Sequence, residues 1–202
     1  MGMAIYKHLT PLLLLAFAAT SGMAAGNEKA GEEKSAACSG CHGEKGHSLI
    51  PLFPKLSGQN AKYLERQLHE FRSGKRVNST MNAMAEALSD EDITDIAAYY
   101  AREKSSSETS EPNRLGQSLF TAGKVQTATP ACTGCHGPKG SGNPSAGFPL
   151  IGGQHAAYIE KTLTDYRSGE RANDPNAIMR QIAQKLTDSE ITALAEHITT
   201  LK

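Results

Sequence analysis

The sequence contains no tryptophan, and aromatic residues make up only 5% of its 202 residues. Net charge is lacking too, because 21 lysine and arginine residues balance 21 aspartate and glutamate residues. This balance excludes a chain whose main function is to bind nucleic acid, since that requires a net basic surface. A chain of this length allows one large domain or two small ones. Two small domains so poor in aromatic residues would have thin cores and would need a disulfide, metal, cofactor or partner for stability.

Long hydrophobic runs are also absent. The longest lies within residues 9–19, which is shorter than the ~20 residues that a membrane-spanning helix needs. It follows a basic start at Lys7 and His8 and precedes small residues at 20–25. This arrangement is typical of a secretory signal peptide, here residues 1–25, and an uncleaved amphipathic anchor is the alternative. We therefore expect an exported mature chain in a compartment that tolerates oxidised sulfur.

The chain carries the same pattern twice. Residues 36–41 read AACSGC and residues 130–135 read PACTGC, and both are followed by His-Gly-x-Lys-Gly. Further pairs of matched residues recur along the two copies, and a unit of roughly 90 residues is too long for a solenoid repeat. We expect a first domain at 26–104 and a second at 113–202. Residues 105–112, which are polar, rich in serine and closed by proline, form the expected linker.

Each copy has the periodicity of helices. Apolar residues three and four positions apart predict helices at 61–73 and 156–168, each followed by a glycine stop signal. The last helix of each copy opens on a capping-box pattern. These signals are Gly74, Gly169, Ser89 with Asp92, and Thr187 with Glu190. No stretch shows sustained alternation with a period of two, so we predict an all-α fold of two small helical domains.

The four cysteines occur in two Cys-x-x-Cys-His motifs. They are Cys38, Cys41 and His42 in the first copy, and Cys132, Cys135 and His136 in the second. This pattern is typical of c-type haem attachment. Two sulfurs three positions apart on a helical turn can each form a thioether with one vinyl group of a haem. The histidine that follows can then place its imidazole on the iron.

Three other interpretations compete with haem attachment. A structural zinc site would need further cysteine or histidine ligands at finger-like spacing, and the sequence has none. A thioredoxin-like redox pair would need a βαβ setting, which the helical pattern opposes. Two disulfides would leave the paired histidines unexplained. Two motifs at equivalent positions of a duplicated, exported chain therefore favour two covalently attached haem c groups.

Counting methionines indicates the sixth iron ligand. Beyond the signal peptide only Met81, Met84 and Met179 remain, so Met179 is the one thioether candidate in the second copy. Met81 stands at the same distance before the repeated Leu-Ser/Thr-Asp as Met179 does, whereas Met84 matches an apolar packing position. We predict Met81 and Met179 as axial ligands, which lie in or beside flexible stretches at 77–80 and 172–176 that can bring the sulfur to the haem. Met84 is predicted as a packing residue in the core or at the haem edge. The alternative for any methionine is gap-filling in a core.

Two prolines and four further histidines allow more than one interpretation. Pro54 and Pro149 each follow a phenylalanine at a similar distance after the ligand histidine. A backbone carbonyl there could accept the Nδ1–H of the imidazole and raise its basicity, and an ordinary loop proline is the alternative. The other histidines do not recur at matched positions, so we expect surface or packing residues. They are His47, His69, His155 and His197.

The combined motifs resemble class I cytochrome c. They are the Cys-x-x-Cys-His near the start, a Phe-Pro segment, a Gly-Gln-x-x-x-Tyr helix, a distal methionine and a final Leu-Ser/Thr-Asp helix. Two such units behind a signal peptide resemble the dihaem cytochrome c4 family over essentially the whole mature chain. The resemblance implies two helical haem domains related by a pseudo-twofold axis, with the haem edges and propionates near the contact between them.

The resemblance also implies a function. It is that of a periplasmic electron carrier, often associated with the inner membrane, between a quinol-oxidising complex and a terminal haem–copper oxidase. Histidine and methionine on each iron favour a high potential and leave no open position for oxygen or peroxide, so we expect an electron-transfer protein and no enzyme. The alternative is the dihaem subunit of an enzyme complex such as a flavoprotein sulfide dehydrogenase. A dihaem peroxidase would require one haem to lose its distal ligand, and the paired Met81 and Met179 argue against this alternative.

Overall fold

The computed structural model describes residues 1–2, 26–107 and 109–202. Apart from its first two residues, the expected signal peptide lies outside the described residues. Every regular element in the described ranges is helical, which confirms the all-α prediction, and the remaining pairings there are two isolated β-bridges. None of the helices found in these ranges combines the length and the apolar character needed to cross a membrane.

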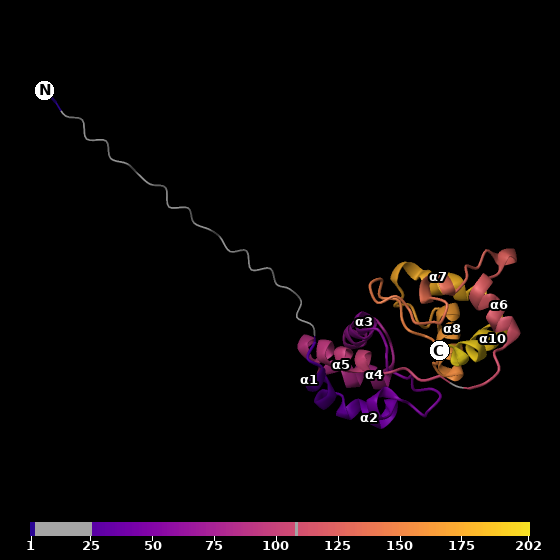
Figure 1. The fold of residues 1–202 in the computed structure, drawn as a ribbon, viewed down its shortest axis with the longest axis horizontal. Coiled ribbons are helices and arrows are strands. Elements are labelled where there is room, and N and C mark those ends of the chain that lie inside the picture. Colours follow the sequence, from indigo (N-terminus) through magenta and orange to yellow (C-terminus); the bar gives the residue numbers. More distant parts are fainter. Residues whose placement is uncertain (3–25, 108) are drawn as a thin grey trace.

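The helices form two groups that follow one another along the chain (Figure 1). The first group contains α1 (Glu28–Lys34), α2 (Ala36–His42), η1 (Glu44–Gly46), α3 (Ala61–Arg72), α4 (Ser79–Glu86) and α5 (Asp90–Arg102). The second group contains α6 (Arg114–Ala122), η2 (Val125–Thr127), α7 (Thr133–His136), α8 (Ala156–Ser168), η3 (Pro175–Ala177), α9 (Ile178–Ala183) and α10 (Asp188–Thr200). Figure 1 shows the two groups side by side, joined by the extended strap that follows α5.

The start and stop signals of the sequence are found in the structure. The two predicted central helices appear as α3 and α8, and Gly169 takes a left-handed conformation directly after α8, with φ of 84°. Both capping boxes are formed, because Ser89 and Thr187 each accept a backbone N–H from the first turn and Asp92 and Glu190 return the bond. An N-cap of this kind contributes about 1 kcal/mol to stability.

The first and last helices of each group cross at a glycine. A Cβ on Gly31 of α1 would lie 2.0 Å from the carbonyl oxygen of Asp95 in α5, and a Cβ on Gly116 of α6 would lie 1.9 Å from that of Ala193 in α10. Only glycine permits these two approaches. Small apolar cores are buried behind the crossings. They contain Leu64, Ile96, Ala97, Tyr99 and Tyr100 in the first group, and Leu119, Phe120, Ile159, Leu163, Leu186, Ile191, Leu194, Ala195 and Ile198 in the second.

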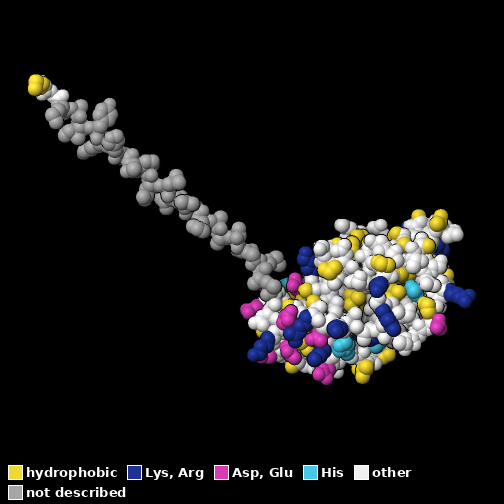
Figure 2. All heavy atoms as spheres, viewed as in Figure 1, with side chains coloured by type: hydrophobic (Ala, Val, Ile, Leu, Met, Phe, Trp, Pro, Cys, Tyr) yellow, Lys and Arg dark blue, Asp and Glu magenta, His cyan; other side chains and the backbone are white. Residues whose placement is uncertain are grey.

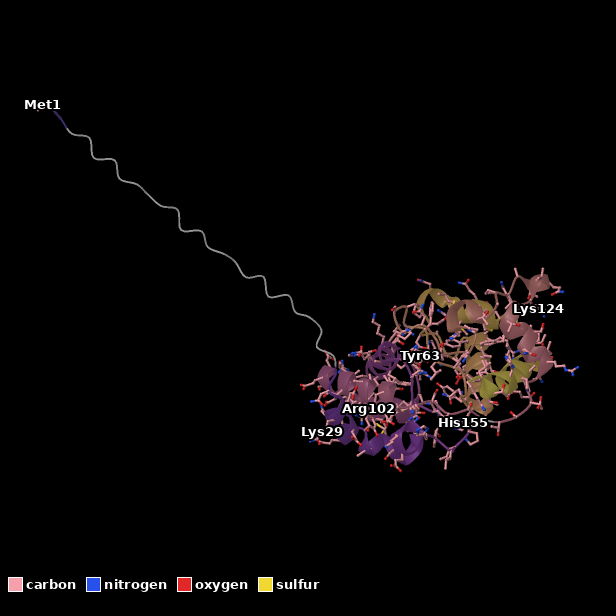
Figure 3. The ribbon with its side chains drawn as sticks, viewed as in Figure 1. Met1, Lys29, Tyr63, Arg102, Lys124 and His155 are labelled. Atoms are coloured by element: carbon pink, nitrogen blue, oxygen red, sulfur yellow. The ribbon has the colours of Figure 1, made fainter. Side chains whose placement is uncertain are left out.

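The two groups contact each other through α3, α8 and the loops around them. Figure 3 shows Tyr63 and His155 between the groups, whereas Lys29 and Lys124 lie towards opposite outer ends. Charged side chains of both signs cover the first group on the face shown in Figure 2, and the upper part of the second group carries few. The residues that lie between the two groups, such as Tyr63 and His155, come from the middle of each copy.

Candidate haem sites

Short helices hold both Cys-x-x-Cys-His motifs. The first motif ends α2 and the second ends α7, so each histidine is the last residue of its helix and is buried. All four thiols are unpaired, which argues against the two-disulfide interpretation. Cys38 and Cys132 pack against the apolar cores of their groups, whereas Cys41 is exposed. The first motif thus presents one thiol to the core and an exposed one, whereas both thiols of the second motif are half-buried.

The surroundings of the thiols also oppose the redox and zinc interpretations. Burial raises the pKa of the Cys38 thiol, and it raises that of Cys132 to about 11. A Cys-x-x-Cys redox pair needs the opposite, a thiol whose pKa is depressed. In the described residues no group of three or more histidine, cysteine or acidic side chains is placed to hold a metal ion. Thiols that are not activated for redox chemistry and do not belong to a metal-binding cluster suit covalent attachment to a haem, which brings its own iron.

Each motif histidine is oriented by a proline carbonyl. The Nδ1–H of His42 donates to the carbonyl oxygen of Pro54 at 2.8 Å, and that of His136 donates to Pro149 at 3.0 Å. This settles the open question about the two prolines in favour of the carbonyl acceptor. Burial lowers the pKa of both histidines and so favours the neutral imidazole, which is the form that binds metals. With Nδ1 engaged, Nε2 is the nitrogen left to bind iron.

The methionines differ in part from the prediction. Met81 and Met179 are half-buried and lie near the starts of the short helices α4 and α9, just after the stretches beside which the sequence placed them. The start of α4 has a local cause, because the Asn78 side chain accepts the backbone N–H of Met81 at 3.0 Å. Met84 is 43% exposed, so it is not a core residue, and packing at the haem edge remains the prediction for it. Met179 packs against the core of the second domain.

The donor set of each domain fits haem c. It combines two unpaired thiols on one helical turn, a buried imidazole held through Nδ1 and a half-buried thioether. The isolated histidines are surface or packing residues, as predicted. His155 is buried and donates through Nε2 to the carbonyl oxygen of Ser48 at 2.9 Å, and His197 packs edge-on against Phe120.

Glutamines at matched positions tie the domains together. Gln59 Nε2 donates to the carbonyl oxygen of Leu150 at 2.8 Å, and Gln59 Oε1 accepts the N–H of Leu150 at 2.9 Å. Gln154 makes the same pair of bonds with Lys55, at 3.0 and 2.9 Å. Both glutamines are buried. The exchange is reciprocal, as a pseudo-twofold arrangement of the two domains requires.

Two arginine–tyrosine pairs repeat this symmetry. Arg171 donates to the hydroxyl oxygen of Tyr63 at 3.0 Å, and Arg76 donates to that of Tyr158 at 3.1 Å. Each guanidinium also lies over an aromatic ring of its own domain, at 4.6 and 4.5 Å from the ring centroid. Burial alone would raise the pKa of the Tyr158 hydroxyl. The positive charges of Arg76 and Arg171 outweigh this effect and lower the pKa from its usual value of 10 to about 8. The interface therefore contains two buried or half-buried cations.

One part of the interface is not symmetric. Gln67 Oε1 accepts from Arg76, Arg171 and Asn173, at 2.8, 3.0 and 2.9 Å, and Glu70 accepts from Asn173 as well. Asn173 lies in the loop that is longer in the second copy, and the matching Asn78 of the first copy caps α4 instead. Sequence analysis assigned no role to these residues. The available signal was that Arg76 recurs as Arg171 at a matched position of the second copy, whereas Gln67 has no glutamine as its counterpart.

Comparisons with known proteins agree with this architecture. The cytochrome c family model matches residues 28–101 and 114–202. Cytochrome c4 of Pseudomonas aeruginosa is 46% identical over 195 residues, which span 95% of this chain and 97% of that protein. Reduced recombinant cytochrome c4 from Pseudomonas stutzeri matches with a TM-score of 0.85 at 45% identity, over 88% of this chain and all of that one. A thiosulfate dehydrogenase electron acceptor of Stutzerimonas stutzeri (strain A1501) is 38% identical over 169 residues, 80% of this chain and 77% of that protein.

Two cytochrome c domains with these motifs define a dihaem c-type cytochrome, an electron-transfer protein that carries two covalently bound haem c groups. The chain belongs to the cytochrome c4 family. The predicted class of protein, its cofactors and its tandem architecture are thereby confirmed.

Proposed function

We propose that the two haems are held by matched residues of the two domains. The thioether bonds are formed by Cys38 and Cys41 in the first domain and by Cys132 and Cys135 in the second. The axial ligands are His42 with Met81, and His136 with Met179. The observation that carries this proposal is the pair of short helices in which each motif histidine donates to a proline carbonyl. We place the domains at 26–104 and 113–202, with the linker at 105–112.

This ligand set suits electron transfer without bond making. A thioether opposite an imidazole favours ferrous iron and raises the reduction potential, and two protein ligands leave no open position on the iron. The carbonyls of Pro54 and Pro149 fix the imidazole planes, so the ligands move little between oxidation states. The protein supplies ligation, burial and the placement of two centres on either side of one interface.

Membership of the family supports a proposal about the physiological partners. We propose a periplasmic carrier that accepts electrons from a quinol-oxidising complex, delivers them to a terminal haem–copper oxidase and associates peripherally with the inner membrane. The relative that serves as a thiosulfate dehydrogenase electron acceptor supports a second candidate, in which a periplasmic sulfur-oxidising enzyme is the donor. That candidate retains the alternative of a dihaem partner of an enzyme, with a thiosulfate dehydrogenase in place of a sulfide dehydrogenase.

Two experiments test the proposal. Pyridine haemochrome analysis of the purified protein is expected to give two covalent haems per chain, and Cys38→Ala with Cys41→Ala to give one. A result of one haem or none in the unmodified protein would contradict the proposal. Stopped-flow reduction by a purified quinol-oxidising complex and by a thiosulfate dehydrogenase separates the two donors, because the physiological one is expected to reduce the protein much faster at matched driving force.

A further inference from the structure

The proline carbonyls that accept from the motif histidines belong to peptide groups that reach across the domain interface. The carbonyl oxygen of Pro54 accepts the Nδ1–H of His42, and the N–H of the same peptide group, on Lys55, donates to Gln154 Oε1 at 2.9 Å. One peptide group therefore joins the proposed ligand of the first haem to a side chain of the second domain.

The second domain repeats the arrangement in reverse. The carbonyl oxygen of Pro149 accepts from His136, and the N–H of the same peptide group, on Leu150, donates to Gln59 Oε1 at 2.9 Å. The coupling is thus crossed, because each domain supplies the glutamine that contacts the peptide group behind the other domain's histidine.

Both glutamines are held so that their Oε1 atoms stay on these peptide groups. Gln154 Oε1 also accepts the N–H of His155 at 3.0 Å, and its Nε2 donates to the carbonyl oxygen of Lys55 at 3.0 Å. Gln59 has the matching bonds, to the N–H of Asn60 at 2.9 Å and to the carbonyl oxygen of Leu150 at 2.8 Å. Gln59 is 6% exposed and Gln154 is 7% exposed, so neither side chain can exchange its partners freely for water.

Hydrogen bonds at the two ends of a peptide group polarise one another. When the N–H of a peptide group donates a hydrogen bond, the carbonyl oxygen of the same group becomes more negative and accepts more strongly. In a chain of such hydrogen bonds each one therefore strengthens the next. A stronger acceptor at Nδ1 makes the imidazole a more basic ligand, as carbonyl and carboxylate partners of ligand histidines do at other metal sites. A more basic imidazole stabilises ferric iron and lowers the reduction potential.

We infer that Gln154 and Gln59 are crossed positioning residues, each of which tunes the reduction potential of the haem in the opposite domain through the proline peptide group and the axial histidine. This inference rests on the proposed ligation by His42 and His136. It means that the potential of each centre depends on the domain interface being closed, so any partner that loosens the interface raises both potentials.

Spectroelectrochemical titration of single variants tests the inference. Gln154→Leu removes the acceptor from Lys55 and is expected to raise the potential of the first haem. At fixed electrode potential, its ratio of reduced to oxidised form should rise about threefold or more, which corresponds to roughly 28 mV at 59 mV per tenfold for one electron. The second haem, in the domain that carries the substitution, should shift less. Gln59→Leu is expected to give the mirror-image result.

A measurement that does not depend on potentials accompanies the titration. In the reduced protein, the NMR resonance of the His42 Nδ1–H is expected to move upfield in Gln154→Leu while that of His136 stays in place, because only the first bond weakens. Tyr158→Phe is the matched control, since it removes an interdomain hydrogen bond that touches neither proline peptide group. It is expected to leave both Nδ1–H resonances unchanged.

Gln154→Met covers the case in which the leucine variant does not fold. It keeps the length of the side chain and removes the oxygen that accepts the Lys55 N–H, so the His42 Nδ1–H should move upfield and the potential of the first haem should rise more than that of the second. Shifts confined to the domain that carries the substitution, or unchanged Nδ1–H resonances in both glutamine variants, would overturn the inference. An unmodified protein without two histidine-ligated haems would instead refute the proposed function.

Discussion

The guanidinium of Arg171 in the second domain lies 3.0 Å from the hydroxyl oxygen of Tyr63 in the first. Arg171 is 7% exposed, and it also donates to Gln67 of the first domain at 3.0 Å. A buried cation is stable only when its hydrogen bonds are satisfied, and here the partners come largely from the other domain. The second domain therefore depends on the first to solvate this charge.

Replacing this arginine should weaken the docking of the two domains. Arg171→Met is expected to lower the free energy of unfolding by about 2–4 kcal/mol, because it leaves buried acceptors on Tyr63 and Gln67 with fewer partners. Chemical denaturation followed by far-UV circular dichroism measures the change. Arg114→Met, at an exposed position at the start of α6, is the control and should stay within about 0.5 kcal/mol of the unmodified protein. Equal effects of the two substitutions would show that the interdomain arginine contributes nothing.

Acid should destabilise the second domain through His197. Both ring nitrogens of this buried side chain lack a hydrogen-bond partner, and burial lowers its pKa from the usual value of 6.5. Between the two pKa values the unfolded chain binds a proton that the folded domain does not, so stability falls as the pH drops below about 6.5 and is unaffected above it. The ring packs against the uncharged Phe120 side chain, with 5.4 Å between the ring centroids.

His197→Phe is expected to remove this acid sensitivity. The variant should unfold with less pH dependence between pH 7 and roughly pH 5, and it should be more stable by about 1 kcal/mol, because two unpartnered buried nitrogens are lost. Thermal unfolding at a series of pH values is the measurement. Tyr99→Phe changes the equivalent residue of the first domain and should leave the pH dependence as it was. An unchanged pH profile in His197→Phe would rule out this histidine as the acid-sensitive group.

Local signals were sufficient to predict most of the fold. The duplicated motifs, the glycine after α8 and the two capping boxes each depend on residues close together in the chain, and all are present in the structure. The positions of Met81 and Met84 were less predictable, because they depend on where α4 begins. The Asn78 cap starts that helix, and its rotation then leaves Met84 on the exposed side.

The interface could not be derived from local signals. Gln59 and Gln154 contact residues about half the chain away, so their partners depend on how two finished domains dock. A glutamine that recurs at matched positions of both copies indicates only that its polar side chain has the same role in each domain. Asn173 offers even less, because its matching residue Asn78 caps a helix, whereas its own bonds to Gln67 and Glu70 require the docked arrangement.

The two proposed methionine ligands can be distinguished from the exposed one by spectroscopy. Met179→Ala is expected to abolish the thioether-to-ferric charge-transfer band of the second haem and to leave that of the first. Met81→Ala should do the reverse, because each thioether would serve the haem of its own domain. Met84→Ala, at a 43% exposed position, is the control and should affect neither band. Loss of the first band in Met84→Ala with its retention in Met81→Ala would reverse the assignment.

Gly153 should be the least replaceable glycine at the domain contact. Its φ is +75°, and a Cβ there would lie 2.1 Å from the carbonyl oxygen of Ser106 in the strap between the domains. Gly169 has a similar φ of +84° with nothing within 4 Å, so Gly169→Ala isolates the conformational cost of about 1 kcal/mol. Gly153→Ala carries the same cost and a backbone clash, and is expected to lose about 3 kcal/mol or more in unfolding free energy.

The clash should also have a local signature that simple strain would not produce. Since the strap has to move away from Gly153, Gly153→Ala is expected to speed proteolysis within residues 104–113, whereas Gly169→Ala should leave cleavage there unchanged. Because Gln154 is the next residue, the displaced backbone should also weaken its bond to the N–H of Lys55. The Lys55 amide hydrogen should then exchange faster in Gly153→Ala than in the unmodified protein. If the two alanine variants lose equal stability and are cleaved at equal rates, the strap does not hold Gly153 and the close approach has no energetic consequence.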